Sequence, residues 1–476
     1  MHRKVLRVIA LLAVAGAVAG IAAASDRAHA TTTPVTFGAP QYVDTTLAGG
    51  EPIVMADPAK GTIVYTAHEG TTHLYRDGYL SSPFGDFSFV GNYCNQVNIW
   101  VSSDGGTTWQ RDHYLNPVNP CAGLQTNDDG FSDPDLTMDA SGTMYNTGIN
   151  LVNDSVFAST DGGRTWTQGT ANCHDGDRPW LAGGKAGEVF MTTDPAEDTL
   201  NHAMFVSTDG GQTCSTTEIP DYGTMPDGSS YDGQGKLYMD PAHHQKIAEP
   251  VLINEPNGQF DLGVSTWNRG DTKFTPHVAV RNTSMNSHWP ALAIDRGNFI
   301  YLVWATDSGN GHPNKVMMTV SRDFGQTFSP PTVIAAPSRA QAFWPWVTAG
   351  SVGRVSIVWY QTNPGELGNI DSTPVHVSIY EMSIIDGTRY GPINAAGRPI
   401  HVGTVCTGGT TCVATGEDRR LGDFFTNATT ANGCVMIASG DTMLTDVLTG
   451  EQLPTSRPIF IKQTSGPSLY KNGNCG

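Results

Sequence analysis

The chain of 476 residues contains 54 Gly and 29 Pro, and 15% of its residues are charged, against about 25% in average globular proteins. This composition excludes a coiled coil and a disordered chain, which are both richer in charge. Acidic residues outnumber basic ones by 45 to 27, for a formal net charge of -18. Because nucleic-acid binding needs a basic surface, we expect no nucleic-acid partner.

The beginning of the chain has the pattern of a secretory signal. Basic residues precede an apolar run from Val8 to Ala24, and Ala28-His29-Ala30 offers a small-x-small cleavage site. We therefore predict that residues 1–30 are a signal peptide and that residues 31–476 form a single secreted, extracellular domain. The alternative is an uncleaved membrane anchor, but the run is short for a span, so we expect no stable membrane insertion.

The eight cysteines are an even number, which favours disulfides in an oxidising compartment. Other connectivities are possible, and we do not expect a thiol nucleophile. Pairing by nearness along the chain predicts the disulfides Cys94–Cys121, Cys173–Cys214, Cys406–Cys412 and Cys434–Cys475.

An eight-residue pattern, Ser-x-Asp-x-Gly-x-Thr followed by an aromatic residue or Cys, recurs along the chain. Clear copies begin at Ser102, Ser159, Ser207 and Ser321, and weaker copies begin at Ser265 and Ser383. The regular spacing predicts one β-rich unit per copy. The Asp can cap backbone N–H groups, and the Gly can adopt a positive φ, so the pattern predicts a tight hairpin turn. Its Asp residues are therefore poor catalytic candidates.

These octets resemble the Asp-box, or BNR, repeats of sialidase-like secreted β-propellers. The resemblance covers nearly the whole chain after residue 30 and implies a scaffold first and a carbohydrate activity second, because such propellers include hydrolases and non-catalytic receptors. Seven strand pairs can be counted, and the segment Phe37–Val43 looks like the strand that follows an octet. We predict an all-β, seven-bladed β-propeller of four-stranded blades, closed by N- and C-terminal strands, with six blades as the alternative.

The resemblance places a functional pocket on the face opposite the octets, where the first strand of each blade begins. Alignment of the first strands brings one or two residues per blade to this face: Glu51, Asp133, Asp177 with Arg178, Gln234, His288 with Trp289, Trp344, and Asp423 with Phe424. One half of the ring is acidic and the other is aromatic. This arrangement suits a sugar, because carboxylates bind hydroxyl groups and indoles stack on the apolar face of the ring.

The predicted function is that of a sialidase-like glycoside hydrolase acting on an extracellular glycan or polysaccharide. Such an enzyme needs two carboxyl groups across the scissile bond, and Glu51 and Asp133 are the leading pair, with Asp177 and Asp423 in reserve. Their crowding should raise the pKa of one member. Sialidases carry an Arg-Ile-Pro segment in blade one, and the corresponding Gly50-Glu51-Pro52 lacks the arginine, which argues against true sialidase activity. The candidate substrate-binding residues are His68, Arg76, Arg178, His288, Trp289, Trp344 and Arg420.

Two other functions stay as alternatives. A uronate polysaccharide lyase would use a His or Tyr as the base and an Arg to neutralise the uronate, and His68, His73, Tyr75 and Arg76 lie close together in the sequence. A non-catalytic propeller that binds glycan or protein would need only the aromatic half and the loop surface.

The proposed chemistry requires no cofactor. The segment from Asn127 to Asp135 is rich in carboxylates, and Asp128 and Asp129 could bind Ca²⁺ through hard oxygen ligands, although the spacing is not that of an EF-hand. We expect the protein to be a monomer.

Overall fold

The computed structural model describes residues 33–70, 72–75, 96–112, 130–149, 154–174, 176–195, 201–309, 311–409 and 411–476. Pro34 to Gly476 belong to one compact unit. Several sequence predictions lie outside the described residues: the signal segment, the Cys94–Cys121 pair, Arg76, Asp128 and Asp129.

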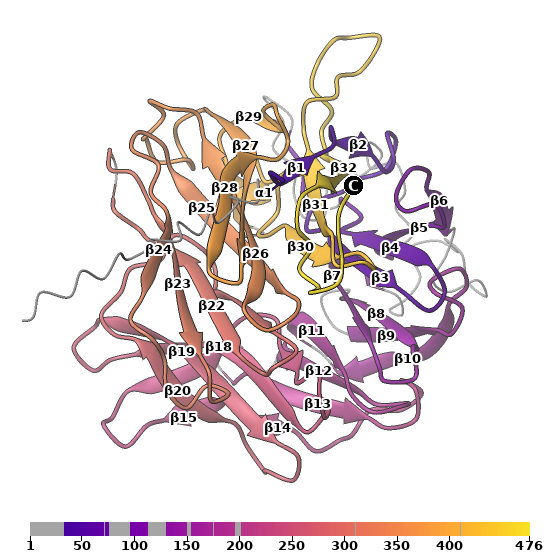
Figure 1. Cartoon of the computed structure of the whole chain (residues 1–476), viewed down its shortest axis with the longest axis vertical. Helices are drawn as coiled ribbons and strands as arrows, with labels where there is room; N and C mark the ends of the chain where they lie inside the picture. The colour runs from indigo at the N-terminus through magenta and orange to yellow at the C-terminus, as the bar shows by residue number, and fades with distance from the viewer. Residues whose placement is uncertain are drawn as a thin grey trace, which may run out of the picture. The chain divides into compact units, whose positions relative to one another are not determined.

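Seven antiparallel sheets follow one another along the chain and form a seven-bladed β-propeller (Figure 1). Blade one contains β3 (Ile53–Asp57), β4 (Thr62–Ala67), β5 (Asn98–Ser102) and β6 (Gln110–Asp112). Blade two contains β7 (Ser132–Met138), β8 (Met144–Ile149), β9 (Asp154–Ser159) and β10 (Thr167–His174). Blade three contains β11 (Asp177–Gly183), β12 (Val189–Asp194), β13 (Ala203–Ser207) and β14 (Ile219–Pro220).

Blade four contains β15 (Tyr222–Thr224), β16 (Ser230–Gly233), β17 (Tyr238–Met239), β18 (Lys246–Asn254), β19 (Phe260–Asn268) and β20 (Thr275–Val280). Blade five contains β21 (Ala291–Ile294), β22 (Ile300–Ala305), β23 (Val316–Ser321) and β24 (Thr332–Ala335). Blade six contains β25 (Ala342–Ala349), β26 (Arg354–Thr362), β27 (Val375–Ile385), β28 (Thr388–Asn394) and β29 (His401–Gly403). Blade seven contains β30 (Thr426–Thr429), β31 (Val435–Asp441) and β32 (Arg457–Ser465), with β1 (Thr36–Phe37) and β2 (Gln41–Tyr42) from the N-terminal side.

The innermost strands form a closed ring. In order, β3, β7, β11, β17, β21, β25 and β30 lie beside one another, and β30 returns to β3. Their neighbours β4, β8, β12 and β22 are buried along their whole length, because each blade packs between two others. This double burial explains why these strands are rich in aliphatic and aromatic residues.

The chain closes the ring in the predicted way. Phe37 pairs with Gln463, and Gln41 pairs with Phe460, so β1 and β2 supply the outer strand of blade seven. The Tyr42 hydroxyl also donates a hydrogen bond of 2.9 Å to Asp441 Oδ1. The N-terminal strands therefore cover the edge of β32, which would otherwise be unpaired.

The octets form the predicted hydrogen-bonded turns. In the copy that begins at Ser159, Asp161 Oδ1 accepts hydrogen bonds of 3.0 Å from the backbone N–H groups of Arg164 and Thr165. Gly163 has a φ of 83°, and a Cβ on it would lie 2.3 Å from a methyl group of Val64 in blade one. The turn therefore needs glycine for its backbone conformation and for its close packing against the preceding blade.

Blade four departs from the regular pattern. Its first strand is divided into β16 and β17, which both pair with β18, and Gln234 lies between them. The additional strand β15 pairs with β16. The first strand of blade four is therefore interrupted at the residue that the sequence alignment brings to the pocket face.

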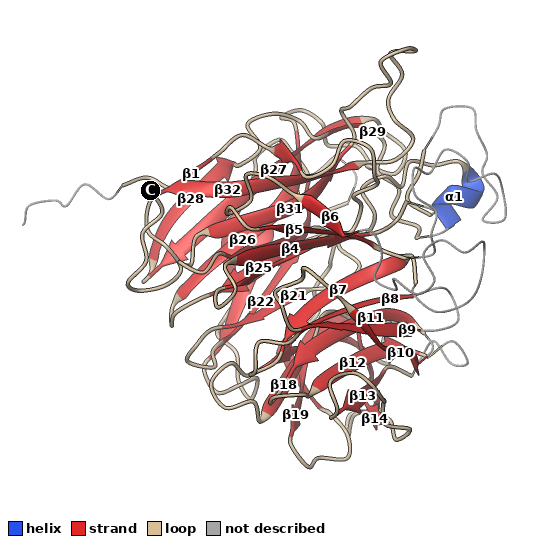
Figure 2. Ribbon diagram, turned by 90° about the vertical axis from the view of Figure 1, so that its right-hand side faces the viewer, coloured by secondary structure: helices blue, strands red, loops and turns tan. Residues whose placement is uncertain are grey.

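Three of the predicted disulfides are present: Cys173–Cys214, Cys406–Cys412 and Cys434–Cys475. In the described part of the chain the one helix is α1 (Thr411–Thr415), and no described helix is long and apolar enough to cross a membrane. Figure 2 shows α1 on the side of the molecule away from the C-terminus.

Candidate active site

A cavity of about 210 Å³ lies where the first strands of several blades begin, and we call it the axial cavity. Glu51, Asp133, Asp177 and Asp423, the four carboxyl residues selected from the sequence, all line it. First and third strands of a blade run in the same direction, and the octets follow the third strands. The axial cavity therefore lies on the face opposite the octet turns.

The same backbone conformation positions several of these side chains. Glu51, Asp133 and Arg178 have φ values of 49°, 48° and 58°, which are uncommon for residues other than glycine. In β7 and β11 the pairing register shifts at these residues, as it does at a β-bulge. The bulge interrupts the alternation of side chains along the strand. It thereby re-aims the side chains that line the cavity at the start of each strand.

Glu51 is a buried carboxyl group, with 2% of its surface exposed. Its Oε1 accepts a hydrogen bond of 2.9 Å from the backbone N–H of Asp423 and lies 3.2 Å from His73 Nε2. Its Oε2 is buried without a hydrogen-bond partner. Burial, and then the nearby charge of Asp423, raise the pKa of Glu51 to about 8. Glu51 is therefore largely protonated at neutral pH.

Two stacked histidines lie next to Glu51. The rings of His68 and His73 are 3.7 Å apart. His68 Nδ1 accepts a hydrogen bond of 2.7 Å from Gly70 N, and Nε2 therefore carries the proton that faces Thr72 Oγ1 at 3.0 Å. Burial lowers the pKa of both histidines well below the usual range. Both are fully buried, and neither lines the axial cavity, so His68 does not lie at the predicted substrate-binding position.

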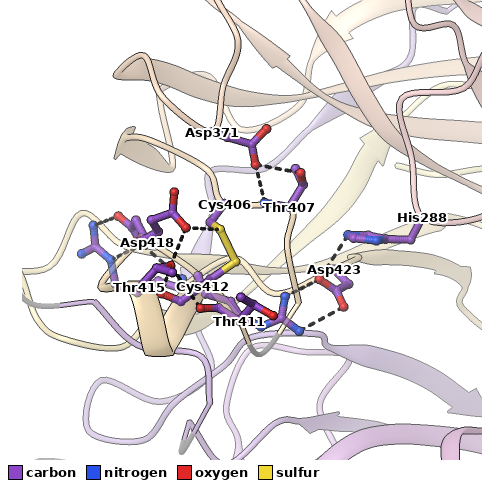
Figure 3. Close-up of a disulfide and its surroundings, with 12 residues drawn as sticks. His288, Asp371, Cys406, Thr407, Thr411, Cys412, Thr415, Asp418 and Asp423 are labelled. Atoms are coloured by element: carbon purple, nitrogen blue, oxygen red, sulfur yellow. Dashed lines mark hydrogen bonds and ion pairs between the residues drawn. A yellow bond between two sulfur atoms is a disulfide. The ribbon is translucent and has the colours of Figure 1, made fainter. Parts of the chain in front are cut away.

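Asp423 has the opposite electrostatic environment from Glu51. Figure 3 shows His288 pointing toward the Asp423 carboxyl. Arg419 binds it through two contacts, Nη1–Oδ1 at 2.5 Å and Nη2–Oδ2 at 3.0 Å, and His288 Nε2 lies 3.2 Å from Oδ1. Although burial alone would raise the pKa of Asp423, Arg419 and His288 hold it well below the usual range. Asp423 is therefore ionised at neutral pH.

Asp133 is a partly exposed carboxyl group in the cavity wall. It accepts a hydrogen bond from the Ser132 hydroxyl. Burial, and then the charges of Glu51 and Asp177, raise the pKa of Asp133 well above the usual range. The Asp177 side chain is 55% exposed, so it lies at the solvent side of this group.

Arg178 is the cation on the other side of Asp177. Its Nη1 donates a hydrogen bond of 3.3 Å to Gln234 Oε1 and lies 3.6 Å from Asp194 Oδ2. Its guanidinium carbon lies 5.0 Å from the centre of the Trp289 ring. Arg178 and Trp289 thus form one wall of the axial cavity, although the alignment of first strands placed them on opposite sides of the ring.

No family model and no curated protein matches the chain. Similar solved structures include a polysaccharide lyase of a new family, an ulvan lyase, which is 10% identical over 92% of this chain and 96% of that chain, with a TM-score of 0.44. The phage phi92 endosialidase is 10% identical over 90% of this chain and 69% of that chain, with a TM-score of 0.46. An α-L-arabinofuranosidase from Fusarium graminearum is 14% identical over 90% of this chain and 97% of that chain, with a TM-score of 0.40.

Besides His68, three residues selected from the sequence for substrate binding lie outside the cavity lining: His288, Trp344 and Arg420. Trp344 is buried and packs against His288 and Tyr360. Arg420 is buried in an ion pair of 2.6 Å with Asp418 and also donates a hydrogen bond of 2.9 Å to Gln452. Trp344 and Arg420 therefore have structural partners and do not line the axial cavity.

Arg419 and Trp180 are among the cavity residues that the sequence selection missed. Arg419 lines the cavity, although its neighbour Arg420 was selected instead. The four-residue spacing between Arg419 and Asp423 is the signal that could have identified it, because it brings the two charges together. Trp180 also lines the cavity, but a buried aromatic residue in a strand gives no sequence signal that separates it from the core.

A disulfide loop forms part of the rim (Figure 3). Cys406 and Cys412 close the loop, and Gly408 and Gly409 within it line the cavity. Thr407 fastens the loop to blade six, because its N–H and hydroxyl donate hydrogen bonds of 2.6 and 2.7 Å to Asp371 Oδ1. Glu417 lies 3.4 Å from the Cys406 sulfur, but the disulfide leaves no thiolate there for a metal ion.

Proposed function

We propose that the protein is a glycoside hydrolase that cleaves an extracellular glycan in the axial cavity, with Asp133 as the proton donor and Asp423 as the ionised partner. The observation that carries this proposal is the opposite direction of two pKa shifts in one cavity: the pKa of Asp133 is raised and that of Asp423 is lowered. Two carboxyl groups with pKa values pushed apart are what acid-assisted glycoside cleavage requires.

The reaction follows from the two protonation states. Asp133 gives its proton to the glycosidic oxygen as the bond to the anomeric carbon breaks, and positive charge develops on the sugar ring. Asp423 stabilises this charge and stays ionised because Arg419 and His288 bind it. Water then adds to the anomeric carbon and returns a proton to Asp133. No metal ion or cofactor takes part in these steps.

The remaining cavity residues provide binding and orientation. The indole of Trp289 can stack on the apolar face of a sugar, and Arg178 and Asp177 offer a donor and an acceptor for hydroxyl groups. The buried position of His68 disfavours the lyase alternative, since a base must contact the proton that it removes. The three disulfides support an extracellular location.

The test is the release of reducing ends from sialylated, uronate-containing and neutral glycans by the purified protein and by Asp133→Asn. We expect the parent to cleave one of these classes and the variant to lose about 10²- to 10⁴-fold in kcat, the usual contribution of a general acid. The rate should also fall as the pH rises through the pKa of Asp133, because the proton donor is lost.

The matched control is Glu218→Gln, which removes one exposed carboxylate on the octet face and should keep full activity. Equal rates for the parent and Asp133→Asn would exclude Asp133 as the acid. An unsaturated uronate product would establish a lyase. Glycan binding without cleavage, unchanged in Asp133→Asn, would establish a binding propeller.

A further inference from the structure

A second group of buried charges lies between blades three and four, outside the residues that line the axial cavity. His202 is fully buried, and both of its ring nitrogens face carboxylates. Nδ1 bonds to Asp194 of β12, and Nε2 lies 2.6 Å from Glu249 Oε1 of β18. Since both nitrogens have carboxylate acceptors, His202 carries two N–H groups and a positive charge.

Three buried side chains beside His202 have oxygen atoms without a partner. Asp221 has no exposed surface, and neither of its carboxyl oxygens has a hydrogen-bond partner. The same holds for Glu249 Oε2 and for Ser265 Oγ, both of which are also fully buried. A buried oxygen of this kind is costly unless a cation or a proton satisfies it.

The sheet pairing brings these oxygens together. Glu249 and Ser265 are direct partners in the β18–β19 pair, so their side chains lie on the same face of blade four. The carboxyl of Asp221 lies near the Ser265 hydroxyl and near Glu249, and the charge of Glu249 acts on it directly.

Backbone contacts hold Asp221 in this place. Its N–H donates a hydrogen bond of 2.9 Å to His202 O, and its carbonyl accepts one of 2.9 Å from Gly233 N. A Cβ on Gly233 would lie 2.9 Å from Asp221 Oδ2, so the glycine leaves the space that the carboxyl occupies. The unpartnered oxygens are therefore fixed in position by the fold.

Acidic side chains outnumber basic ones in this region. Four carboxyl groups, Asp194, Asp221, Asp232 and Glu249, face the imidazolium of His202 and, at the edge of the group, the guanidinium of Arg178. A divalent cation bound here would supply the partner that the buried oxygens of Asp221, Glu249 and Ser265 lack.

We propose that Asp221, Glu249 and Ser265 bind a Ca²⁺ ion between blades three and four. All the available ligand atoms are hard oxygens, and Ca²⁺ accepts irregular sets of carboxylate, hydroxyl and backbone oxygens. Mg²⁺ fits less well, because it requires near-octahedral geometry and gives up its water reluctantly. The ion joins β18 and β19 to the segment before β15. Its role is to stabilise blade four, so the proposal does not depend on the proposed hydrolase activity.

The test is calcium binding by the full chain after treatment with a chelator. Calorimetric titration with CaCl₂ should show one more site in the parent than in Asp221→Asn. The Tm of the parent should rise by several degrees with CaCl₂ and not with MgCl₂ or NaCl at equal ionic strength, because a ligand that binds only the folded state stabilises it. Ser265→Ala should weaken the binding without removing it.

The matched control is Asp232→Asn, because the Asp232 oxygens already accept hydrogen bonds of 3.2 Å from His202 N and 3.1 Å from Gln234 Nε2. This variant should keep the calcium response. An equal response in Asp221→Asn would overturn the proposal and place any calcium elsewhere, as would the absence of a response in the parent. If Asp221→Asn does not fold, an unchanged titration in Ser265→Ala and in Glu249→Gln would overturn it.

Discussion

Four carboxyl groups share the axial cavity, and their immediate contacts decide which of them carries a charge. The Glu51 carboxyl accepts a hydrogen bond from the backbone N–H of Asp423, and its Oε2 has no hydrogen-bond partner. The Asp423 carboxyl, in contrast, binds the guanidinium group of Arg419. Burial favours the neutral form of both, but Arg419 makes two close contacts with Asp423, whereas its Nη2 lies 3.8 Å from Glu51 Oε1. The same surroundings that make the cavity suitable for acid catalysis therefore also make the stability of the protein depend on pH.

Glu51→Gln should change that pH dependence. The pKa of Glu51 is about 8 in the folded protein and 4.5 ordinarily, so between these values the folded state holds a proton that the unfolded state has lost. The contribution of Glu51 to the free energy of unfolding is fully present below pH 4.5 and is lost as the pH rises toward 8. The variant keeps the acceptor oxygen and cannot ionise. The free energy of unfolding of the variant, relative to that of the parent, should therefore rise by about 3–5 kcal/mol as the pH increases from 4.5 to 8.

Urea unfolding of the parent and of Glu51→Gln across this pH range measures the difference. Glu218→Gln removes an exposed carboxyl group and should follow the parent at every pH. If the curves of stability against pH run parallel for the parent and Glu51→Gln, Glu51 is ionised in the folded protein and its assignment here is wrong.

At the scale of the strand, the alignment of first strands located the cavity residues because each blade repeats one backbone position. Glu51, Asp133, Arg178 and Trp344 all have a left-handed φ at the entry to a first strand. The repeat gives the position of the Cα atom but not what covers the side chain. Trp344 shares the conformation and is nevertheless enclosed by Phe343 and its neighbours.

Loop residues could not be placed in the same way. His68 follows β4, and Arg420 precedes β30, in segments that no other blade repeats. The sequence therefore shows that these side chains are polar or charged, but it does not show which way they point. Arg419 and Arg420 are adjacent, yet one binds Asp423 in the cavity and the other binds Asp418 outside it. That choice depends on contacts with distant segments, such as Gln452, that a single sequence does not reveal.

The Cys406–Cys412 loop should affect substrate binding more than stability. It closes a short loop, with a sequence separation of 6, so its loss should cost about 2 kcal/mol of stability. The loop carries Gly408 and Gly409 at the cavity rim, and a looser rim must be ordered when the substrate binds. Kinetics of the Cys406→Ser/Cys412→Ser variant should show KM raised about tenfold with a smaller change in kcat.

The Cys434–Cys475 disulfide provides the contrast. It has a sequence separation of 41 and includes the penultimate residue of the chain. Figure 2 shows the C-terminus on the side of the molecule away from α1. Its removal should cost about 4 kcal/mol, more than that of the rim disulfide, and should leave KM unchanged. If both double variants change KM equally, the rim loop has no specific role in binding.

At the scale of the whole molecule, the sequence predicts the seven-bladed ring well, because strand pairs mark all seven blades, octets mark the first six, and the N-terminal strand completes the seventh. The strands β1 and β2 are short, yet their pairing with β32 connects the N-terminal and C-terminal strands of the ring. Val35 and Val43 are buried at this join, and Tyr42 reaches Asp441 of β31. Stability of the entire ring should therefore depend on a segment of about ten residues.

Deletion of residues 31–43 tests this dependence. The variant loses the two buried valines and the pairing with β32, which should lower the free energy of unfolding by about 3–6 kcal/mol, as measured by urea denaturation. It also leaves β32 as an unpaired edge, so we expect the deletion variant to self-associate in size-exclusion chromatography.

A synthetic peptide of residues 33–43 should bind this edge as an added strand and restore both the stability and the monomeric state of the deletion variant. A scrambled peptide of the same composition should not, because the register places Phe37 opposite Gln463 and Gln41 opposite Phe460. Unchanged stability after the deletion would mean that inter-blade packing alone closes the ring.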